Sequence, residues 1–135
     1  MKEKKLQTGK KILVVDDDSV MRDVLKELLI GRGYYICLAS NGEEALKVIE
    51  ETEFDLVITD LKMPKMGGIE LFDEMTRRSL KIPVIVLTGT PHELVRCAQK
   101  KRTFAGILTK PFDLKEFMSC VSTACGNSSE IQKAS

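Results

Sequence analysis

The stretch LVITDLKMPKMGG, residues 56–68, joins a wholly apolar run to a single carboxylate, Asp60, and a loop with Pro64 and two glycines. Continuous rather than alternating hydrophobicity is typical of a strand covered on both faces, as in a parallel sheet. The stretch therefore predicts a buried strand that ends at one acid. Four more runs of this kind are found at residues 11–15 (KILVV), 34–39 (YYICLA), 83–87 (PVIVL) and 106–108 (GIL).

Longer segments with helical spacing separate the five apolar runs. In residues 21–29, for example, the apolar side chains recur every three or four positions, and two glycines at 31 and 33 follow. Right-handed crossovers between the runs give an α/β fold, a doubly wound five-stranded parallel sheet with helices on both faces. The residues predicted to begin or cap the helices are Asp18 or Ser19, Asn41, Gly68, Thr90 and Asp113.

Length and composition indicate one ordinary globular domain. With 135 residues, we expect a flexible segment over 1–9, a domain over 10–125 and a flexible tail over 126–135. The balance of 21 basic against 20 acidic residues gives no field that would recruit nucleic acid or anionic lipid. No targeting or membrane-spanning run is found, and the four cysteines lack metal-ligand spacing. We therefore expect a cytoplasmic protein with reduced thiols.

Polar side chains follow four of the predicted strands. Three acids, residues 16–18, follow the first strand, Asp60 the third, Thr88 ends the fourth, and Lys110 comes shortly after the fifth. The carboxyl ends of parallel strands share one edge of a sheet, so these groups should converge. Crowded carboxylates repel one another unless a cation neutralises them, and oxygen-only ligands favour Mg²⁺ or Mn²⁺. Such a site suits phosphoryl transfer, with Asp60 as the nucleophile that forms an acyl phosphate.

The motifs ILVVDDDSVMR, DLVITDLKMPKMGGIEL, PVIVLTG and TKPF, in this order, resemble the receiver domain of two-component response regulators over about residues 9–125. The resemblance implies a flavodoxin-like sheet with strand order 2-1-3-4-5. It also implies that Asp60 accepts a phosphoryl group from a sensor histidine kinase or a phosphotransfer protein. The implied metal ligands and phosphate-binding groups are Asp16, Asp17, Asp60, the backbone carbonyl of Lys62, Thr88 and Lys110.

The resemblance carries further expectations for the switch. Lys62 and Thr90 would tune hydrolysis of the phosphate, and the Lys110–Pro111 bond would be cis. A protein target would bind the face made by the fourth helix, fifth strand and fifth helix. A phosphorylation-dependent homodimer is compatible with the family, whereas direct contact with nucleic acid or membrane is not expected. The chain would catalyse only its own phosphorylation and dephosphorylation.

Two positions depart from the family pattern. Gly67 replaces the usual acid in the loop, which should loosen the start of the third helix. Ile107 replaces the aromatic residue that rotates as a switch in many members, and an isoleucine cannot report phosphorylation by such a rotation.

Two other functions compete with this interpretation. DDDSV, residues 16–20, also resembles the signature of haloacid-dehalogenase-type phosphatases, with Asp16 as nucleophile and Asp18 as acid/base. Such enzymes need a further metal-binding acid pair on a later strand, whereas here only Asp60 follows. A flavodoxin-type binding module would need a Ser/Thr/Gly-rich phosphate loop after the first strand, where this chain has acids that would repel a phosphate.

Overall fold

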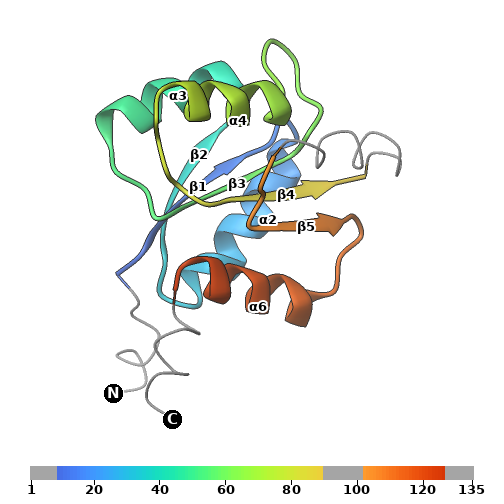
Figure 1. Ribbon diagram of the computed structural model, residues 1–135. Helices are drawn as coiled ribbons and strands as arrows, with labels where there is room; N and C mark the ends of the chain where they lie inside the picture. Colours follow the sequence, from blue (N-terminus) through green and yellow to red (C-terminus); the bar gives the residue numbers. More distant parts are fainter. Residues whose placement is uncertain (1–8, 90–101, 127–135) are drawn as a thin grey trace.

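The computed structural model describes residues 9–89 and 102–126, which form one parallel five-stranded sheet in the order β2-β1-β3-β4-β5 (Figure 1). The predicted α/β class and strand order are confirmed. The strands are β1 (Lys11–Val15), β2 (Tyr35–Ala39), β3 (Leu56–Thr59), β4 (Val84–Thr88) and β5 (Gly106–Thr109). The described helices are α2 (Ser19–Ile30), α3 (Gly42–Glu51), α4 (Gly68–Arg77) and α6 (Leu114–Ala124).

Strand limits differ from the predicted runs by one residue at four places, one of which is the start of β4 at Val84 instead of Pro83. Tyr34 belongs to the turn before β2, because its N–H donates to the carbonyl of Leu29 and its side chain is buried against α2 and α6. β4 and β5 each extend one residue further than predicted, since Thr88 pairs with Thr109. The helix predicted to begin at Thr90 lies outside the described residues. All described elements fall within 10–125, and the domain limits themselves remain a prediction.

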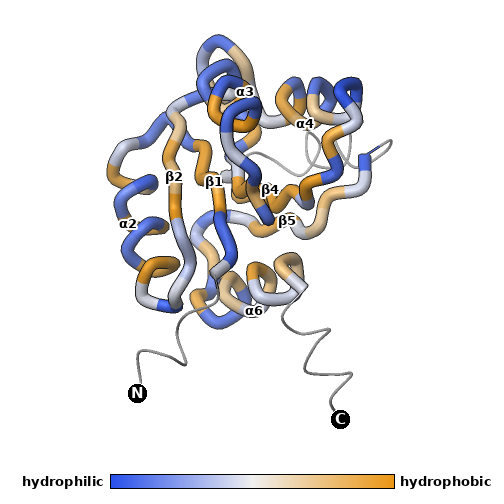
Figure 2. The backbone as a smooth tube through the Cα atoms, turned by 90° about the vertical axis from the view of Figure 1, so that its left-hand side faces the viewer, coloured by the Kyte–Doolittle hydropathy of each residue, from blue (hydrophilic) through white to orange (hydrophobic). Residues whose placement is uncertain are grey.

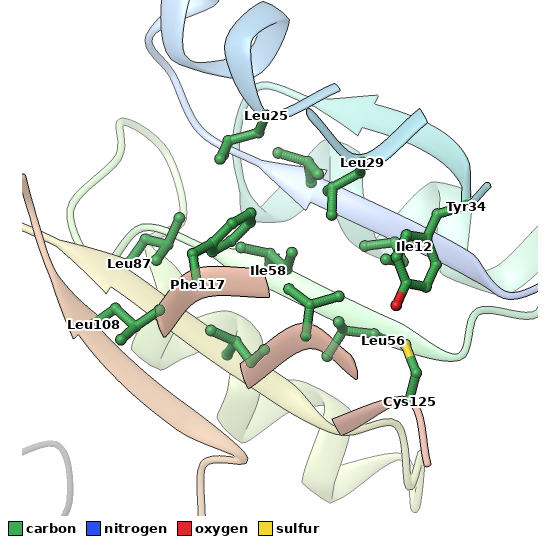
Figure 3. Packing of buried hydrophobic residues seen from close by; sticks show 13 residues of the cluster. Ile12, Leu25, Leu29, Tyr34, Leu56, Ile58, Leu87, Leu108, Phe117 and Cys125 are labelled. Atoms are coloured by element: carbon green, nitrogen blue, oxygen red, sulfur yellow. The ribbon is translucent and has the colours of Figure 1, made fainter. Parts of the chain in front are cut away.

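Helices cover both faces of the sheet, α2 and α6 on one face and α3 and α4 on the other (Figure 1). In Figure 2 hydrophobic colour runs along β4, whereas α2 alternates between hydrophobic and hydrophilic colour, as expected for a helix with one buried face. Figure 3 shows the first core cluster, in which Leu25 and Leu29 of α2 and Phe117 of α6 pack on the same face of the sheet. The two cores fix the sheet between them and hold its carboxyl edge in place.

Side-chain caps start three of the helices as the sequence predicts. Asp18 accepts hydrogen bonds from two N–H groups of α2, Asn41 accepts from Glu44 N of α3, and Asp113 accepts from Glu116 N of α6. These bonds satisfy donors that helix ends otherwise leave unpaired. None of the helices in the described parts of the chain has the length and apolar character that a bilayer crossing requires.

The segment that leads into β5 is tied to α4. Both nitrogens Nε and Nη2 of Arg102 donate to the Asp73 carboxylate, at 2.8 and 2.6 Å. Next to this ion pair, the rings of Phe72 and Phe104 meet edge to face with their centroids 4.8 Å apart. A fixed point on α4 therefore holds the chain just before β5.

Two neighbouring glycines after α2 should respond oppositely to alanine. Gly31 has a right-handed φ of −61°, whereas Gly33 has a φ of +90°. Gly31→Ala should therefore raise the free energy of unfolding by about 0.4–1 kcal/mol, because alanine restricts the unfolded chain. Gly33→Ala should lower it by about 1–2 kcal/mol, since the left-handed region is unfavourable for a Cβ. Urea denaturation of both variants measures the difference, and equal effects would contradict the described turn.

Candidate functional site

Three acids from two strands meet at the carboxyl edge of the sheet. Asp16 and Asp17 follow β1, Asp60 follows β3, and carboxylate oxygens of the three lie within 4.8 Å of one another. Asp16 is only 2% exposed, Asp60 is partly buried and Asp17 is exposed. Parallel register places them together, because Val15 at the end of β1 pairs with Thr59 at the end of β3. The predicted convergence of the acids is thus present in the structure.

Lys110 reaches this cluster from the end of β5. Its Nζ donates to Asp16 Oδ2 and to Asp60 Oδ2, both at 3.1 Å. Burial alone would lower the pKa of this ammonium, but the hydrogen bonds and charges of the two carboxylates outweigh it, so the pKa is raised. The Lys110–Pro111 bond is cis, as the resemblance implied. Lys110 is therefore a fixed positive charge between two acids.

The turn after β1 is held by several bonds. The Asp16 N–H donates to the carbonyl of Ala39 at 3.1 Å, and Asp16 Oδ1 accepts from Asp18 N at 3.0 Å. Arg22 Nη1 donates to the carbonyl oxygen of Asp16 at 2.6 Å. Sequence reasoning did not single out Arg22, although it lies in the motif ILVVDDDSVMR. The only feature of the sequence that could have indicated its contact with Asp16 is its place one helical turn after the three acids.

Asp18 is engaged differently from its two neighbours. Its Oδ1 accepts from Val20 N at 3.0 Å and from Met21 N at 3.4 Å, which caps α2. Asp18 is also absent from the group of acids that meet at the sheet edge. A phosphatase mechanism would need this residue as its acid/base, so its role as a cap weighs against that alternative.

The loop after Asp60 is held in place by hydrogen bonds that involve its backbone. Asp60 Oδ1 accepts from Leu61 N at 2.7 Å, and the Leu61 carbonyl accepts from Gly68 N at 2.9 Å. Further along, the Met66 carbonyl accepts from Gly42 N at the start of α3, at 2.8 Å. A Cβ on Gly42 would lie only 2.6 Å from Met66 Cγ. Glycine at this position thus lets the loop pack on α3.

Gly67 at the start of α4 provides no side-chain cap. However, the Glu70 carboxylate accepts from Gly67 N at 3.1 Å and so satisfies one N–H of the first turn. A Cβ on Gly67 would lie 2.5 Å from the Leu61 carbonyl oxygen, so this backbone accommodates glycine. The start of α4 is held despite the missing acid.

The other predicted site residues lie at or near this edge. Lys62 is exposed and, with Asp17, lines a groove of about 500 Å³ beside the acids. Thr88 is fully buried at the end of β4, and its carbonyl accepts from Lys110 N at 2.9 Å. Ile107 on β5 is partly buried and packs against the core beneath α3 and α4. Thr90 lies outside the described residues.

The donor set fits a hard divalent cation. The three clustered ligands are carboxylates, and no histidine or cysteine belongs to this group in the described residues. Oxygen ligands with room for water or phosphate are what Mg²⁺ and Mn²⁺ prefer. One ammonium cannot neutralise three carboxylates, so a cation would also relieve the remaining repulsion.

Comparisons with known proteins agree on one family. The model of the response regulator receiver domain family matches residues 12–122. The alkaline phosphatase synthesis transcriptional regulatory protein PhoP of Bacillus subtilis is 36% identical over 108 residues, which are 80% of this chain and 45% of that protein. The transcriptional regulatory protein CpxR of Klebsiella pneumoniae is 38% identical, covering 80% of this chain and 46% of that protein. The chain spans about half of these relatives.

Solved structures agree with the match. The receiver domain of the Francisella response regulator 1452 superposes with a TM-score of 0.80 at 28% identity, covering 88% of this chain and 98% of the other. The response regulator TrrA of Thermotoga maritima, determined in complex with Mg²⁺-BeF, has a TM-score of 0.76 at 36% identity, covering 85% of this chain and 98% of the other. The flavodoxin-like arrangement is therefore shared by these proteins.

Proposed function

The chain belongs to the response regulator receiver domain family of two-component signalling, and from that premise we propose that Asp60 accepts a phosphoryl group in a Mg²⁺-dependent reaction. The donor would be the phosphohistidine of a sensor histidine kinase or a phosphotransfer protein. The observation that carries the proposal is the Lys110 ammonium, 3.1 Å from both Asp16 and Asp60 beside the exposed Asp17. This arrangement combines a carboxylate nucleophile, a fixed cation and ligands for a second cation.

In the proposed reaction an oxygen of Asp60 attacks the phosphorus atom. The new O–P bond forms as the P–N bond to the donor imidazole breaks, and the released imidazole takes up a proton from solvent. Asp16, Asp17, Asp60 and the backbone carbonyl of Lys62 would hold Mg²⁺, which when bound neutralises charge on the phosphoryl oxygens. Lys110 exchanges its contact with Asp60 for one with the phosphate, and stays paired with Asp16.

The proposed output is a shift between two conformations. Phosphate on Asp60 would attract the Thr88 hydroxyl, and the end of β4 would move with it. Because Thr88 is bonded through its carbonyl to Lys110 N, the end of β5 follows the same movement. Ile107 cannot rotate as an aromatic ring does, so the shift would reach the target-binding face by this backbone route. Lys62 and Thr90 would adjust the lifetime of the acyl phosphate.

Partners and output belong to the same proposal. A protein target, bound at the face that includes β5 and α6, would read the phosphorylated state, and a phosphorylation-dependent homodimer is one form of that response. The relatives named above are transcriptional regulators that this chain matches over about half their length. With a net charge of +1, the receiver itself would make no direct contact with nucleic acid or membrane. The proposed reaction takes place in the cytoplasm.

The phosphatase alternative gains no support. Both the family match and the solved structures are receiver domains, and Asp18 caps α2. We therefore propose that the chain catalyses only its own phosphorylation and dephosphorylation.

Incubation with acetyl phosphate tests the proposal. With Mg²⁺, the intact mass should rise by one phosphoryl group, and peptide mapping should place it on Asp60. Removal of the metal with EDTA should reduce labelling at least about 100-fold, because the carboxylates would then repel the incoming phosphate. Labelling that survives EDTA, or sustained turnover of the donor that depends on Asp16 as nucleophile, would contradict the proposal.

A further inference from the structure

Arg22 supports the acid cluster from outside it. The residue lies on α2, is partly buried, and donates from Nη1 to the carbonyl oxygen of Asp16 at 2.6 Å. Its charge also reaches Glu44 of α3. Hydrogen bonds from Ser40 are the main cause of the lowered pKa of Glu44, and the Arg22 charge adds to it. The guanidinium thus bonds the turn after β1 and lies near enough to α3 for its charge to act on Glu44.

Asp16 has two kinds of contact. Its carboxylate is bonded to Lys110 and to Asp18 N, which belong to the site or to the same turn. Its backbone is bonded to Ala39 and to Arg22, which lie outside the acid cluster. Uptake of a cation and a phosphate would change side-chain contacts within the site, such as that of Lys110 with Asp60, whereas the backbone contacts of Asp16 can persist. Arg22 is therefore well placed to hold the turn through such a change.

We propose that Arg22 is a positioning residue, which keeps the Asp16–Asp17 turn in the geometry that binds a divalent cation. The inference rests on the proposed function, since it assumes that this site takes up Mg²⁺. Partners that orient metal ligands typically change metal affinity by about 10- to 100-fold when they are removed. The hydrogen bond from Arg22 to the Asp16 carbonyl oxygen would act by fixing the backbone of the turn, and not through the charge of the guanidinium.

The sign of the change in Mg²⁺ affinity distinguishes a positioning role of Arg22 from an effect of its charge. Arg22 is a cation near a cation site, so its charge alone weakens Mg²⁺ binding, and its removal would strengthen binding. Loss of support for the turn has the opposite effect, because the two carboxylates no longer hold their relative positions. A weaker affinity after neutralisation of Arg22 therefore cannot come from its charge.

The test uses the full chain and Mg²⁺ alone, with binding measured by titration calorimetry. Arg22→Met should weaken Mg²⁺ binding about tenfold, and Arg22→Lys, which keeps an N–H donor on a flexible stem, should recover part of the loss. Lys26→Met removes an exposed positive charge one turn further along α2, and should not weaken binding. Glu44→Gln removes the α3 carboxylate whose pKa the Arg22 charge helps to lower, and should leave the affinity unchanged.

Several outcomes would overturn the inference. Mg²⁺ affinity in Arg22→Met that equals or exceeds that of the wild type would show that Arg22 acts only in the fold or only through its charge. Urea denaturation without Mg²⁺ establishes that the variant is folded. If Arg22→Met does not fold, Arg22→Lys carries the test, and an affinity equal to wild type would overturn the inference. Absence of Mg²⁺ binding by the wild type itself would instead refute the proposed function.

Discussion

Asp60→Asn should abolish labelling by acetyl phosphate and Mg²⁺, with a decrease of at least about 100-fold. The amide cannot act as the anionic nucleophile that forms an acyl phosphate, and the neighbouring acids cannot replace it, because Asp16 is buried behind Lys110 and Asp17 is a proposed metal ligand. Mass spectrometry of the intact chain measures the loss. As a control, Asp23→Asn changes an exposed acid of α2 outside the acid cluster and should keep full labelling.

The same variant should change stability in a metal-dependent way. Without Mg²⁺, Asp60→Asn removes repulsion from two carboxylates within 4.8 Å and one attraction to Lys110 at 3.1 Å. The two repulsions outweigh the attraction, so the free energy of unfolding should rise by about 1 kcal/mol. With Mg²⁺ at 100 times its Kd, the wild type should gain about 2.7 kcal/mol, which the variant largely loses. Thermal unfolding with and without Mg²⁺ should therefore reverse the order of the two proteins. A variant less stable than the wild type without Mg²⁺ would contradict the expected repulsion, and a variant more stable than the wild type with Mg²⁺ would contradict the expected metal binding.

Gly68→Ala should be among the most destabilising single-methyl changes in the chain. A Cβ on Gly68 would lie 2.2 Å from the carbonyl oxygen of Asp60 and 3.2 Å from the Cα of Leu61. Both are backbone atoms, so they cannot move aside as the tip of a side chain can. The start of α4 or the end of β3 must shift, and the free energy of unfolding should fall by about 2–3 kcal/mol, as for other overpacked sites.

The backbone shift caused by Gly68→Ala should also slow the phosphorylation of Asp60. The backbone that Gly68 contacts is that of the acceptor itself, and a misplacement of about 1 Å can lower a rate about 100-fold. We therefore expect the labelling rate of Gly68→Ala to fall under conditions in which the variant is still folded. Gly89→Ala is the matched control, because no atom of the described residues beyond its chain neighbours lies within 4 Å of its added Cβ. Its free energy of unfolding should stay within about 0.5 kcal/mol of wild type. Equal stability of the two variants would contradict the described packing of α4.

The parts of the fold that could be predicted from sequence are those with a local pattern. Continuous apolar runs identify β1, β3 and β4, because a strand buried on both faces has no polar alternation. The caps Asn41 and Asp113 could be predicted since their oxygens bond N–H groups three residues away. Convergence of the acids follows from topology, because parallel strands end at one edge. In contrast, the limit of β2 depends on how Tyr34 packs beneath two helices, which no local pattern records.

The rest of the site depends on contacts between distant segments. The direction of Lys110 came from the family resemblance and not from its spacing, because the sequence alone is equally compatible with a surface lysine. Arg22 was overlooked, since a basic residue on an amphipathic helix usually faces solvent. Likewise, Gly42 and Gly68 read as ordinary loop or helix-start glycines until the structure shows the backbone atoms they contact. Such tertiary contacts leave no periodic signal in a single sequence.

The ion pair between Arg102 and Asp73, with the edge-to-face rings of Phe72 and Phe104, couples the chain before β5 to α4. β5 is also paired with β4 along its length, from Ile85 with Gly106 to Thr88 with Thr109. The chain before β5 is thus held by a helix, and the strand itself by its neighbour in the sheet. Any displacement of Thr88 would therefore load the Arg102–Asp73 ion pair on α4 as well as β5.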